Sequence, residues 1–290
     1  MKLPDFSYEK QAWKKGYQIV IGVDEVGRGS FAGPVVAGAA ALKKIKNSRR
    51  SGISDRVSIL STRRESSDHD AVNAHSSQTA SGQKSKIKNN LESIYKLGIN
   101  DSKKLSPHKR KELVRGIKKY FYWGIGEASV PEINRLGIVK ATAKAMRFAI
   151  KELIAKITNY QNPNNKQLLN SKFQNLKQYP FVLVDAFYIK YVRQIGLKNQ
   201  LPIVRGDEKS ISIAAASILA KVYRDTLMRK LSLVYRKYQW GRNKGYGTEG
   251  HRKAILKFGT VRYHRFKYVE TWLMNKVQIT STKYQTMINN

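Results

Sequence analysis

The stretch IGVDEVGRGSFAGPVV, residues 21–36, sets two adjacent carboxylates, Asp24 and Glu25, at the end of an apolar run and follows them with glycines. A buried strand avoids unpaired charges, because their desolvation is costly. The apolar runs 17–23 and 35–42 are predicted to be two short strands joined by a glycine turn. The two carboxylates therefore fall at the open end of a predicted strand, where a binding or catalytic role would account for their cost.

The composition points to a polyanionic partner. The chain has 290 residues, of which 55 are Lys or Arg and 20 are Asp or Glu, so its formal net charge is +35. A nucleic acid gains affinity from every phosphate that such a protein neutralises. An anionic membrane surface is the alternative, but no basic amphipathic segment stands out and no apolar run approaches about 18 residues. We therefore expect a nucleic-acid-binding protein with no membrane association.

The chain is expected to be a soluble, cytoplasmic protein with one domain. It contains no Cys, which excludes disulfides and thiolate metal sites, and its N-terminus lacks the apolar core of a secretory signal. The predicted domain covers residues 1–278. Within it, residues 44–90 have no aromatic side chain and are rich in Ser, Asn and charge, so a disordered insertion is expected there. Residues 279–290 are expected to form a flexible tail.

Strands and helices alternate along the rest of the chain, which predicts an α/β fold with a mixed central sheet flanked by helices. Ser106 and Pro107 are typical of a helix start. A later helical pattern carries small residues on its first turns, which would allow close approach to a sheet. The predicted strands are 120–127, 181–187 and 201–207, and the predicted helices start at 107, at 131, at 211 and at 247.

Carboxylates follow three of the predicted strands: Asp24 with Glu25, Asp185, and Asp207. Side chains at the ends of neighbouring strands lie close in space, and carboxylates brought together without a cation raise one another's pKa. A divalent cation with hard oxygen ligands, Mg²⁺ or Mn²⁺, removes that conflict. Two such ions can promote phosphodiester hydrolysis. The alternative is that each Asp is an ordinary turn or cap residue, and Asp101 is left outside the site on that ground.

The sequence motifs around these acids support a more specific assignment than the positions of the acids alone. DEVGRGSFAGPVV at 24–36 resembles the signature of the ribonuclease HII family, and DSKKLS at 101–106, VDAF at 184–187, GDEKSISIAAASILAKVYRD at 206–225 and KGYGT at 244–248 follow in the family's order. The resemblance implies an RNase H-like fold and a divalent-metal-dependent endonuclease that acts on the RNA strand of RNA–DNA hybrids. It further implies cutting 5′ to single ribonucleotides in duplex DNA, which leaves 3′-hydroxyl and 5′-phosphate ends and serves ribonucleotide excision repair and primer removal.

By the same resemblance, Asp24, Glu25, Asp185 and Asp207 match the family's metal-binding acids. As a hypothesis about mechanism, we divide them between two ions, Asp24 with Asp207 and Glu25 with Asp185. No histidine general base is expected. Each acid is predicted to be both a metal ligand and catalytic.

The resemblance also assigns substrate contacts. Gly27, Arg28 and Gly29 match a segment whose backbone reads the 2′-hydroxyl of the ribonucleotide, and only glycine lets main-chain atoms approach a sugar so closely. A plain tight turn is the alternative for these glycines. Tyr246 matches a tyrosine that stacks on the following deoxyribose, although a packing role is the alternative. Lys103 and Lys104 are candidate phosphate contacts, or else simply solvated lysines.

The sequence departs from the family pattern at a few positions. Ala186 stands where the family has Gly after the third acid, and Ser30 replaces a position that is often Pro. The family's HRxSF pattern reads HRFKY at 264–268, so His264 and Arg265 receive no role. Residues 44–90 are expected to be inert or a weak tether for nucleic acid.

Two rival interpretations stay open at this point. Ribonuclease HIII carries an added N-terminal domain and tends to have Glu as its fourth ligand, where this chain has Asp207. A non-catalytic basic protein that keeps the fold would not need a metal to act. We expect a monomer whose partners are RNA–DNA hybrids and ribonucleotide-containing DNA. No sliding-clamp peptide is evident, since the tail lacks an apolar-aromatic ending.

Overall fold

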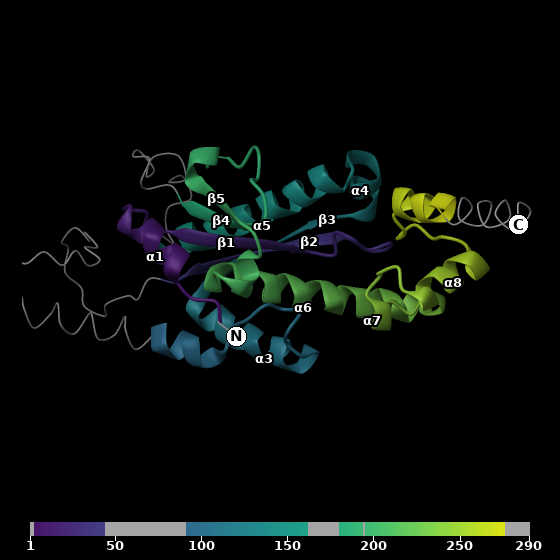
Figure 1. Cartoon of the computed structure of the whole chain (residues 1–290), viewed down its shortest axis with the longest axis horizontal. Helices are drawn as coiled ribbons and strands as arrows, with labels where there is room; N and C mark the ends of the chain where they lie inside the picture. The colour runs from purple at the N-terminus through teal and green to yellow at the C-terminus, as the bar shows by residue number, and fades with distance from the viewer. Residues whose placement is uncertain (1–2, 44–90, 162–179, 194, 276–290) are drawn as a thin grey trace, which may run out of the picture.

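The computed structural model describes residues 3–43, 91–161, 180–193 and 195–275 (Figure 1). The predicted insertion 44–90 and the predicted tail 279–290 lie outside the described residues. No helix within these described ranges is long and apolar enough to cross a membrane. The strands are β1 (Val20–Val26), β2 (Val35–Leu42), β3 (Phe121–Ala128), β4 (Phe181–Asp185) and β5 (Gln200–Ile203). The main helices are α1 (Ser7–Lys14), α3 (Pro107–Tyr120), α4 (Val130–Leu136), α5 (Ile138–Gln161), α6 (Ile211–Val234), α7 (Trp240–Asn243) and α8 (Glu249–Phe258).

The five strands form one mixed sheet in the order β3-β2-β1-β4-β5. The β1–β2 and β2–β3 pairs are antiparallel, whereas the β1–β4 and β4–β5 pairs are parallel. Strand β1, which begins the stretch 21–36, therefore lies at the centre of the sheet with a neighbour on each side. The predicted fold class is confirmed.

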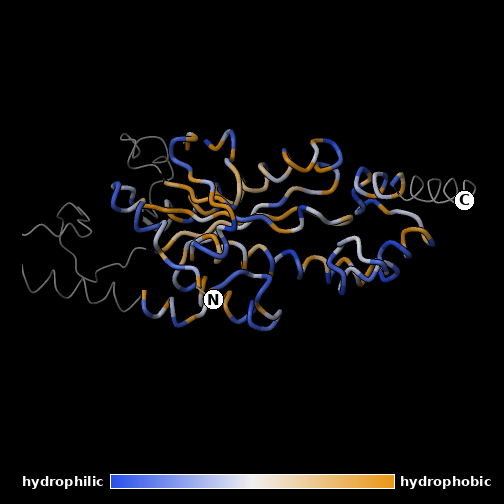
Figure 2. Tube along the Cα trace, in the orientation of Figure 1, coloured by the Kyte–Doolittle hydropathy of each residue, from blue (hydrophilic) through white to orange (hydrophobic). Residues whose placement is uncertain are grey.

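Helices cover both faces of the sheet (Figure 1). On one face α5 packs on β1, β2 and β3, and the buried residues there include Ile21, Val184 and Leu153. On the other face α6 and α3 enclose a second core. Figure 2 shows apolar residues along the strands and polar residues on the outer turns of the helices. This is the layered burial that an α/β domain requires.

The sheet approaches α6 closely because both surfaces carry small residues. A Cβ atom on Gly22 of β1 would lie 2.2 Å from the backbone carbon of Ser212, and one on Gly38 of β2 would lie 2.2 Å from the backbone oxygen of Ala216. Since real Cβ atoms do not approach other atoms so closely, neither position accepts a larger residue without moving α6. The close helix–sheet contact predicted from the small residues of α6 is confirmed.

Several element boundaries differ from the sequence-based prediction. Strand β4 ends at Asp185 instead of 187, and β5 ends at Ile203 instead of 207. The helical pattern that begins near 131 forms two helices, α4 and α5, which are separated at Gly137, where φ is 76°. Helix α4 starts with a capping box between Ser129 and Glu132. In addition, β1 continues to Val26 instead of ending at Val23, because its ladder with β2 extends through the pair Val26↔Val36.

A smaller lobe beyond α6 has its own core. Trp240 and Tyr238 stack there at a centroid distance of 5.3 Å, and Ile255 of α8 and Val269 of the helix 266–275 complete the cluster. Phe31, from the loop between β1 and β2, packs against this lobe. The lobe therefore connects the C-terminal part of the chain to the glycine-rich loop that follows Asp24 and Glu25.

Candidate active site

The register of the sheet brings two of the predicted acids side by side. The parallel ladder between β1 and β4 ends at the pair Val23↔Val184, so the next residues along the two strands are Asp24 and Asp185. Asp24 and Glu25 remain within β1, opposite Gly38 and Ala37 of β2. They lie inside the strand and not after it, because β2 continues to pair with β1 beyond the point where β4 stops.

Asp207 reaches the same place by a different route. It does not end a strand, because β5 stops at Ile203 and Asp207 lies in a short 3₁₀ turn, Gly206–Glu208, before α6. The backbone N–H of Gly206 donates a 2.7 Å hydrogen bond to Oδ1 of Asp185. This bond ties the turn that carries Asp207 to the end of β4.

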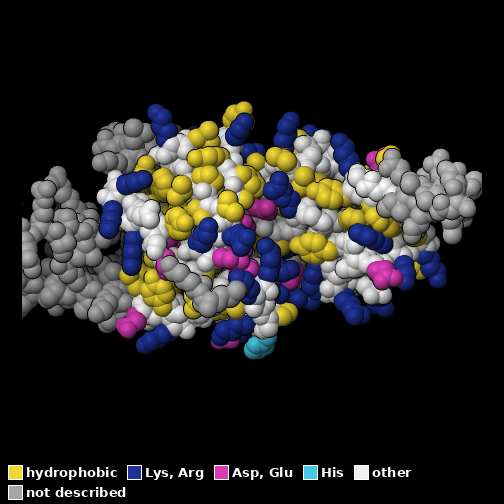
Figure 3. Space-filling model, in the orientation of Figure 1, with side chains coloured by type: hydrophobic (Ala, Val, Ile, Leu, Met, Phe, Trp, Pro, Cys, Tyr) yellow, Lys and Arg dark blue, Asp and Glu magenta, His cyan; other side chains and the backbone are white. Residues whose placement is uncertain are grey.

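The electrostatics show that the four carboxylates share one environment. Burial, and then the charges of Glu25 and Asp185, raise the pKa of Asp24 well above its usual value. Burial raises the pKa of Glu25 to about 7, with Arg28 opposing and Asp185 adding to the effect. On the face shown in Figure 3, acidic side chains gather near the middle of the molecule with lysine and arginine side chains around them. Such mutual repulsion is expected among carboxylates that are arranged to bind a cation.

A fifth acid belongs to this group. Burial, followed by the charges of Asp101 and Asp185, raises the pKa of Asp207 to about 6. Asp101 is 5% exposed. The sequence analysis left it outside the site as a turn residue, and indeed its Oδ1 accepts a 2.9 Å hydrogen bond from the backbone of Lys103. The predicted turn role of Asp101 is present, and the fold in addition places its carboxylate next to Asp207.

The donor set fits a hard divalent cation. Glu25 has a buried Oε2 atom without a hydrogen-bond partner, and an unpaired carboxylate oxygen is a ligand that Mg²⁺ or Mn²⁺ would accept. Across the described ranges, no three His, Cys, Asp or Glu side chains converge tightly enough to form a finished metal site. Asp185 and Asp24 instead accept hydrogen bonds from backbone N–H groups. The carboxylates are thus neighbours that repel one another, and a divalent cation bound among them would offset that repulsion.

The two lysines of DSKKLS have different surroundings. Burial lowers the pKa of Lys103, but the nearby carboxylates Asp207, Asp101, Asp24 and Asp185 outweigh it, so the net shift is upward. Lys103 therefore faces the acids. Lys104 instead forms a 3.0 Å ion pair with Glu208. The structure brings only the first of the two lysines to the carboxylates.

The loop after β1 needs glycine for two separate reasons. At Gly27 φ is 90°, and an added Cβ atom would lie 2.0 Å from Nε of the buried Arg224. At Gly29 an added Cβ atom would have no neighbour within 4 Å. The protein itself thus requires glycine at position 27, whereas the space beside Gly29 is open to a ligand. Arg28 lies 3.8 Å from Glu25 and 5.0 Å above the ring of Phe187.

Two side chains from the C-terminal part of the chain hold this loop, the buried Arg265 and the partly exposed Tyr268. Arg265 donates a 2.8 Å hydrogen bond to the carbonyl of Arg28 and a 2.9 Å bond to that of Gly33. Tyr268 donates to the same Arg28 carbonyl at 3.0 Å. The sequence analysis gave Arg265 no role, and its function is to fix the GRG backbone.

Arg224 of α6 links the same loop to the KGYGT segment. It donates to the carbonyl of Pro34 at 2.9 Å, to the hydroxyl of Ser30 at 3.0 Å and to the carbonyl of Lys244 at 2.9 Å. Ser30, which replaces a frequent Pro, therefore supplies a hydrogen-bond acceptor. The guanidinium carbon lies 5.6 Å from the ring centroid of Tyr246. One buried side chain thus positions both predicted substrate-contacting segments.

Tyr246 is 36% exposed, and its backbone carbonyl is held by His251, which a second histidine, His264, supports in turn. The indole N–H of Trp240 can only donate, so Nε2 of His251, at 3.0 Å, accepts. His251 therefore carries its proton on Nδ1 and donates to the carbonyl of Tyr246 at 2.9 Å. His264 accepts from the N–H of Val261 at Nδ1 and donates from Nε2 to His251 at 3.2 Å. In this arrangement both rings are neutral, and burial lowers the pKa of each; Nδ1 of His264 also lies 3.3 Å from the carbonyl of Val261.

Ala186 adopts the backbone conformation that explains the family's glycine. Its φ is 67°, in the left-handed region that favours Gly. Its N–H donates to the carbonyl of Ile203 at 3.0 Å, which joins the end of β4 to β5. The methyl group is accommodated, and the backbone keeps the left-handed turn.

The central mixed sheet and the carboxylates of β1, β4 and the turn before α6 define a class of protein, the metal-dependent nucleases with an RNase H-like fold. A profile of the family described as Ribonuclease HII matches residues 84–271. The chain is 36% identical over 264 residues to the ribonuclease HII of Caldanaerobacter subterraneus, an alignment that covers 91% of this chain and 79% of the relative. This chain therefore belongs to the ribonuclease HII family.

Further comparisons agree with this assignment. The ribonuclease HII of Fusobacterium nucleatum is 38% identical over 245 residues, which cover 84% of this chain and 82% of that protein. Two solved structures share the fold with a TM-score of 0.50: RNase HII of Archaeoglobus fulgidus, solved in complex with PCNA, and ribonuclease H2 of Pyrococcus horikoshii. The first is 20% identical, covering 86% of this chain and 93% of its own; the second is 19% identical, covering 88% and 98%.

The predicted family is thus confirmed, and with it the prediction of an enzyme. The chain is a ribonuclease H of type HII, an endonuclease, and the family implies metal-dependent activity on RNA–DNA hybrids. The alternative interpretation, a non-catalytic binding protein, is no longer supported, because the curated relatives are named as ribonucleases.

Proposed function

We propose that this enzyme cuts duplex DNA on the 5′ side of a single embedded ribonucleotide, in addition to hydrolysing the RNA strand of hybrids, and leaves 3′-hydroxyl and 5′-phosphate ends. The observation that supports this most is the position of the loop Gly27–Gly29 directly after Asp24 and Glu25 in one strand and turn. A backbone that contacts a 2′-hydroxyl there would place the adjacent phosphodiester bond next to the acids.

Asp24, Glu25, Asp185 and Asp207 would hold the divalent ions, with Asp101 keeping Asp207 in place. Bound Mg²⁺ or Mn²⁺ would supply an activated water and stabilise the leaving 3′-oxygen. Lys103 faces the same acids and would contact the phosphate at the cleaved bond. Lys104 would contact a neighbouring phosphate in place of Glu208, since a partly exposed ion pair costs little to break.

Gly27, Arg28 and Gly29 would contact the ribose, and Tyr246 would stack on the next sugar. The open space beside Gly29 suits a ligand; Arg224 packs against the partly exposed ring of Tyr246, and His251 holds the backbone carbonyl of the same residue. We propose ribonucleotide removal in DNA replication and repair as the setting, in the cytoplasm and as a monomer. The tail, for which no sliding-clamp peptide was predicted, lies outside the described residues.

Cleavage of a labelled duplex with one ribonucleotide tests this proposal. With Mn²⁺ or Mg²⁺ the wild-type enzyme should give a single cut immediately 5′ to the ribonucleotide, and EDTA should abolish it. Ligation of the upstream product to a 5′-phosphorylated oligonucleotide identifies its 3′-hydroxyl. Cleavage of a long hybrid together with no cut at the single ribonucleotide would reject the proposed specificity.

A further inference from the structure

One row of helix α6 leads away from the carboxylates. Ser217, Lys221, Asp225 and Arg229 are spaced by four residues, so they lie along one side of the helix. The Ser217 hydroxyl hydrogen-bonds Asp24 and lies 2.9 Å from the hydroxyl of Ser102. Each step of four residues advances about 6 Å along the helix axis. The row therefore starts at the metal-binding acids and ends on the side of α6 that faces the KGYGT segment.

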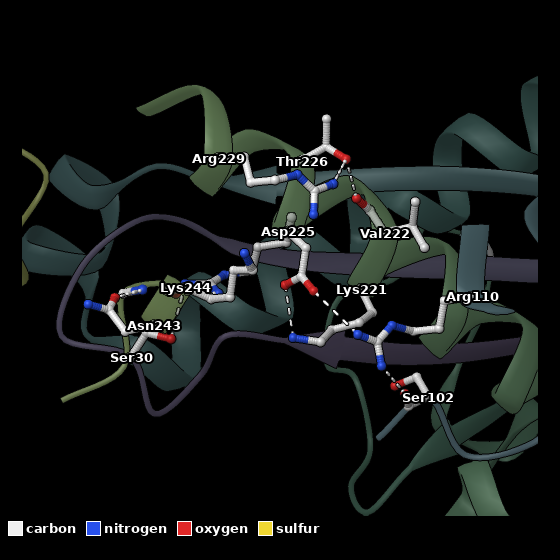
Figure 4. A network of polar contacts seen from close by, with 12 residues as sticks. Ser30, Ser102, Arg110, Lys221, Val222, Asp225, Thr226, Arg229, Asn243 and Lys244 are labelled. Carbon is white, nitrogen blue, oxygen red and sulfur yellow. Dashed lines mark hydrogen bonds and ion pairs between the residues drawn. The ribbon is translucent and has the colours of Figure 1, made fainter. Parts of the chain in front are cut away.

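Two cationic side chains contact the one carboxylate of this row, and two more lie nearby (Figure 4). Lys221 donates a 2.8 Å hydrogen bond to Asp225, and Arg110 of α3 lies 3.7 Å from the second oxygen of Asp225. Arg229 donates a 2.9 Å hydrogen bond to the hydroxyl of Thr226, and Lys244 donates to the carbonyl of Gly241; both lie close enough to this group to interact with it electrostatically. We call Arg110, Lys221, Arg229 and Lys244 the cation cluster.

The cation cluster is not neutralised by its own acid. Burial lowers the pKa of Lys244, and repulsion from Arg229, Lys221 and Arg110 adds to that effect while only Asp225 among its charged neighbours opposes it. Part of the cluster serves the fold, because Arg110 also donates to the carbonyls of Ser102 at 2.6 Å and Leu105 at 2.7 Å. Four cations against one carboxylate still leave an excess of positive charge in a half-buried setting, where an anion is worth more than at the open surface.

We propose that the cation cluster binds a phosphate of the nucleic-acid backbone a few nucleotides from the cleaved bond. The inference rests on the proposed function, because the distance to the bound phosphate is counted from the cleaved bond. Ser217 and Asp225 are eight residues apart, or about 12 Å along α6. With an axial rise of about 3.4 Å per nucleotide, the bound phosphate lies within roughly four nucleotides of the site of cleavage. The ligand is a phosphodiester and not a base, so the contact adds affinity without sequence preference.

A neutral-phosphate scan tests this site. Single methylphosphonates replace each of the four phosphates on either side of the ribonucleotide, in both strands, and the Kd of each duplex is measured in EDTA. The wild-type protein and K221Q are compared, with K230Q as the matched control, because Lys230 lies on the same helix, is exposed and is outside the row. One neutral position should weaken binding by the wild type and by K230Q about tenfold, yet leave K221Q almost unchanged.

K221Q should also lower the slope of log K against log salt by about 0.9, the value for one lost phosphate contact, more than K230Q does. If all positions weaken the wild type and K221Q equally, the cation cluster does not bind a phosphate and the proposal is wrong. If K221Q unfolds early, R229Q takes its place in the same scan. The scan measures binding without metal, so a protein that binds in this way but does not cut would overturn the proposed function and leave this inference standing.

Discussion

The network of His251 and His264 makes a quantitative prediction about stability and pH. Burial, with the adjacent His251, lowers the pKa of His264 from its usual 6.5 to about 4. A base whose pKa is lowered by folding stabilises the folded state above its unfolded pKa and loses that contribution as the pH falls toward the folded pKa. The window for this loss is therefore pH 6.5 to about 4.

The magnitude follows from the shift. At about 1.36 kcal/mol per pKa unit, a shift of roughly 2.5 units corresponds to about 3.4 kcal/mol in full, of which about 2 kcal/mol is lost at pH 5. The physical cause is that burial and the neighbouring His251 disfavour a charge on His264, and the backbone of Val261 offsets only part of that effect. Acidic groups with raised pKa values, such as Asp24 and Glu25, change stability in the opposite direction. A comparison with a variant of His264 is therefore needed to isolate the contribution of this histidine to the pH dependence of stability.

Urea unfolding at pH 8 and pH 5 measures the effect. H264N keeps an acceptor near Nδ1 and cannot be protonated, and H108N changes an exposed histidine as the control. We expect the wild type and H108N to lose about 2 kcal/mol more than H264N does between the two pH values. An identical change in unfolding free energy for all three proteins would refute the neutral-network argument.

Three further predictions concern the backbone and a buried acid. A186G should raise the unfolding free energy by about 1 kcal/mol, because φ at position 186 is 67° and glycine adopts that conformation without strain. The control A155G, in an exposed helical position, should lower the unfolding free energy by about 1 kcal/mol. A urea midpoint for A186G below that of the wild type would contradict this prediction. G27A should lower the melting temperature, because the added methyl group would collide with Arg224. G29A should have the melting temperature of the wild type but lose preference for a ribonucleotide over a deoxynucleotide. Equal melting temperatures of the two variants would count against the steric argument. Burial raises the pKa of Glu9, so the stability that this group contributes is complete below pH 4.5 and declines as the pH rises through the raised pKa. E9Q should therefore lose less unfolding free energy than the wild type between pH 4.5 and 8. Parallel profiles of unfolding free energy against pH for the two proteins would argue against this.

Much of the site could be predicted from the sequence because its signals are local. The apolar run before Asp24 and the glycines after it predicted a strand and a tight turn, and both are present. Small residues at the start of α6 predicted close packing on the sheet, which Gly22 and Gly38 confirm. These features depend on residues close together in the chain, so their patterns can be recognised without a structure.

The remaining features depend on contacts between distant segments. Asp101 looks like a turn acid because it is one, and only the fold brings it to Asp207. Arg265 contacts the carbonyl of Arg28 across 237 positions in the chain, so no local pattern could assign it to the GRG loop. The left-handed backbone of Ala186 likewise becomes visible only in the structure.

The central claim is that mutually repelling carboxylates hold divalent cations at the end of β1. The most direct test is the melting temperature of the wild type and D24N, in EDTA and with increasing Mn²⁺. Because the Asn side chain can still accept the 2.7 Å hydrogen bond from the N–H of Glu25, D24N removes charge with little change in shape. We predict that D24N in EDTA is at least as stable as the wild type, and that Mn²⁺ raises the melting temperature of the wild type only. A D24N protein that is less stable in EDTA and still gains the same stability from Mn²⁺ would contradict the account.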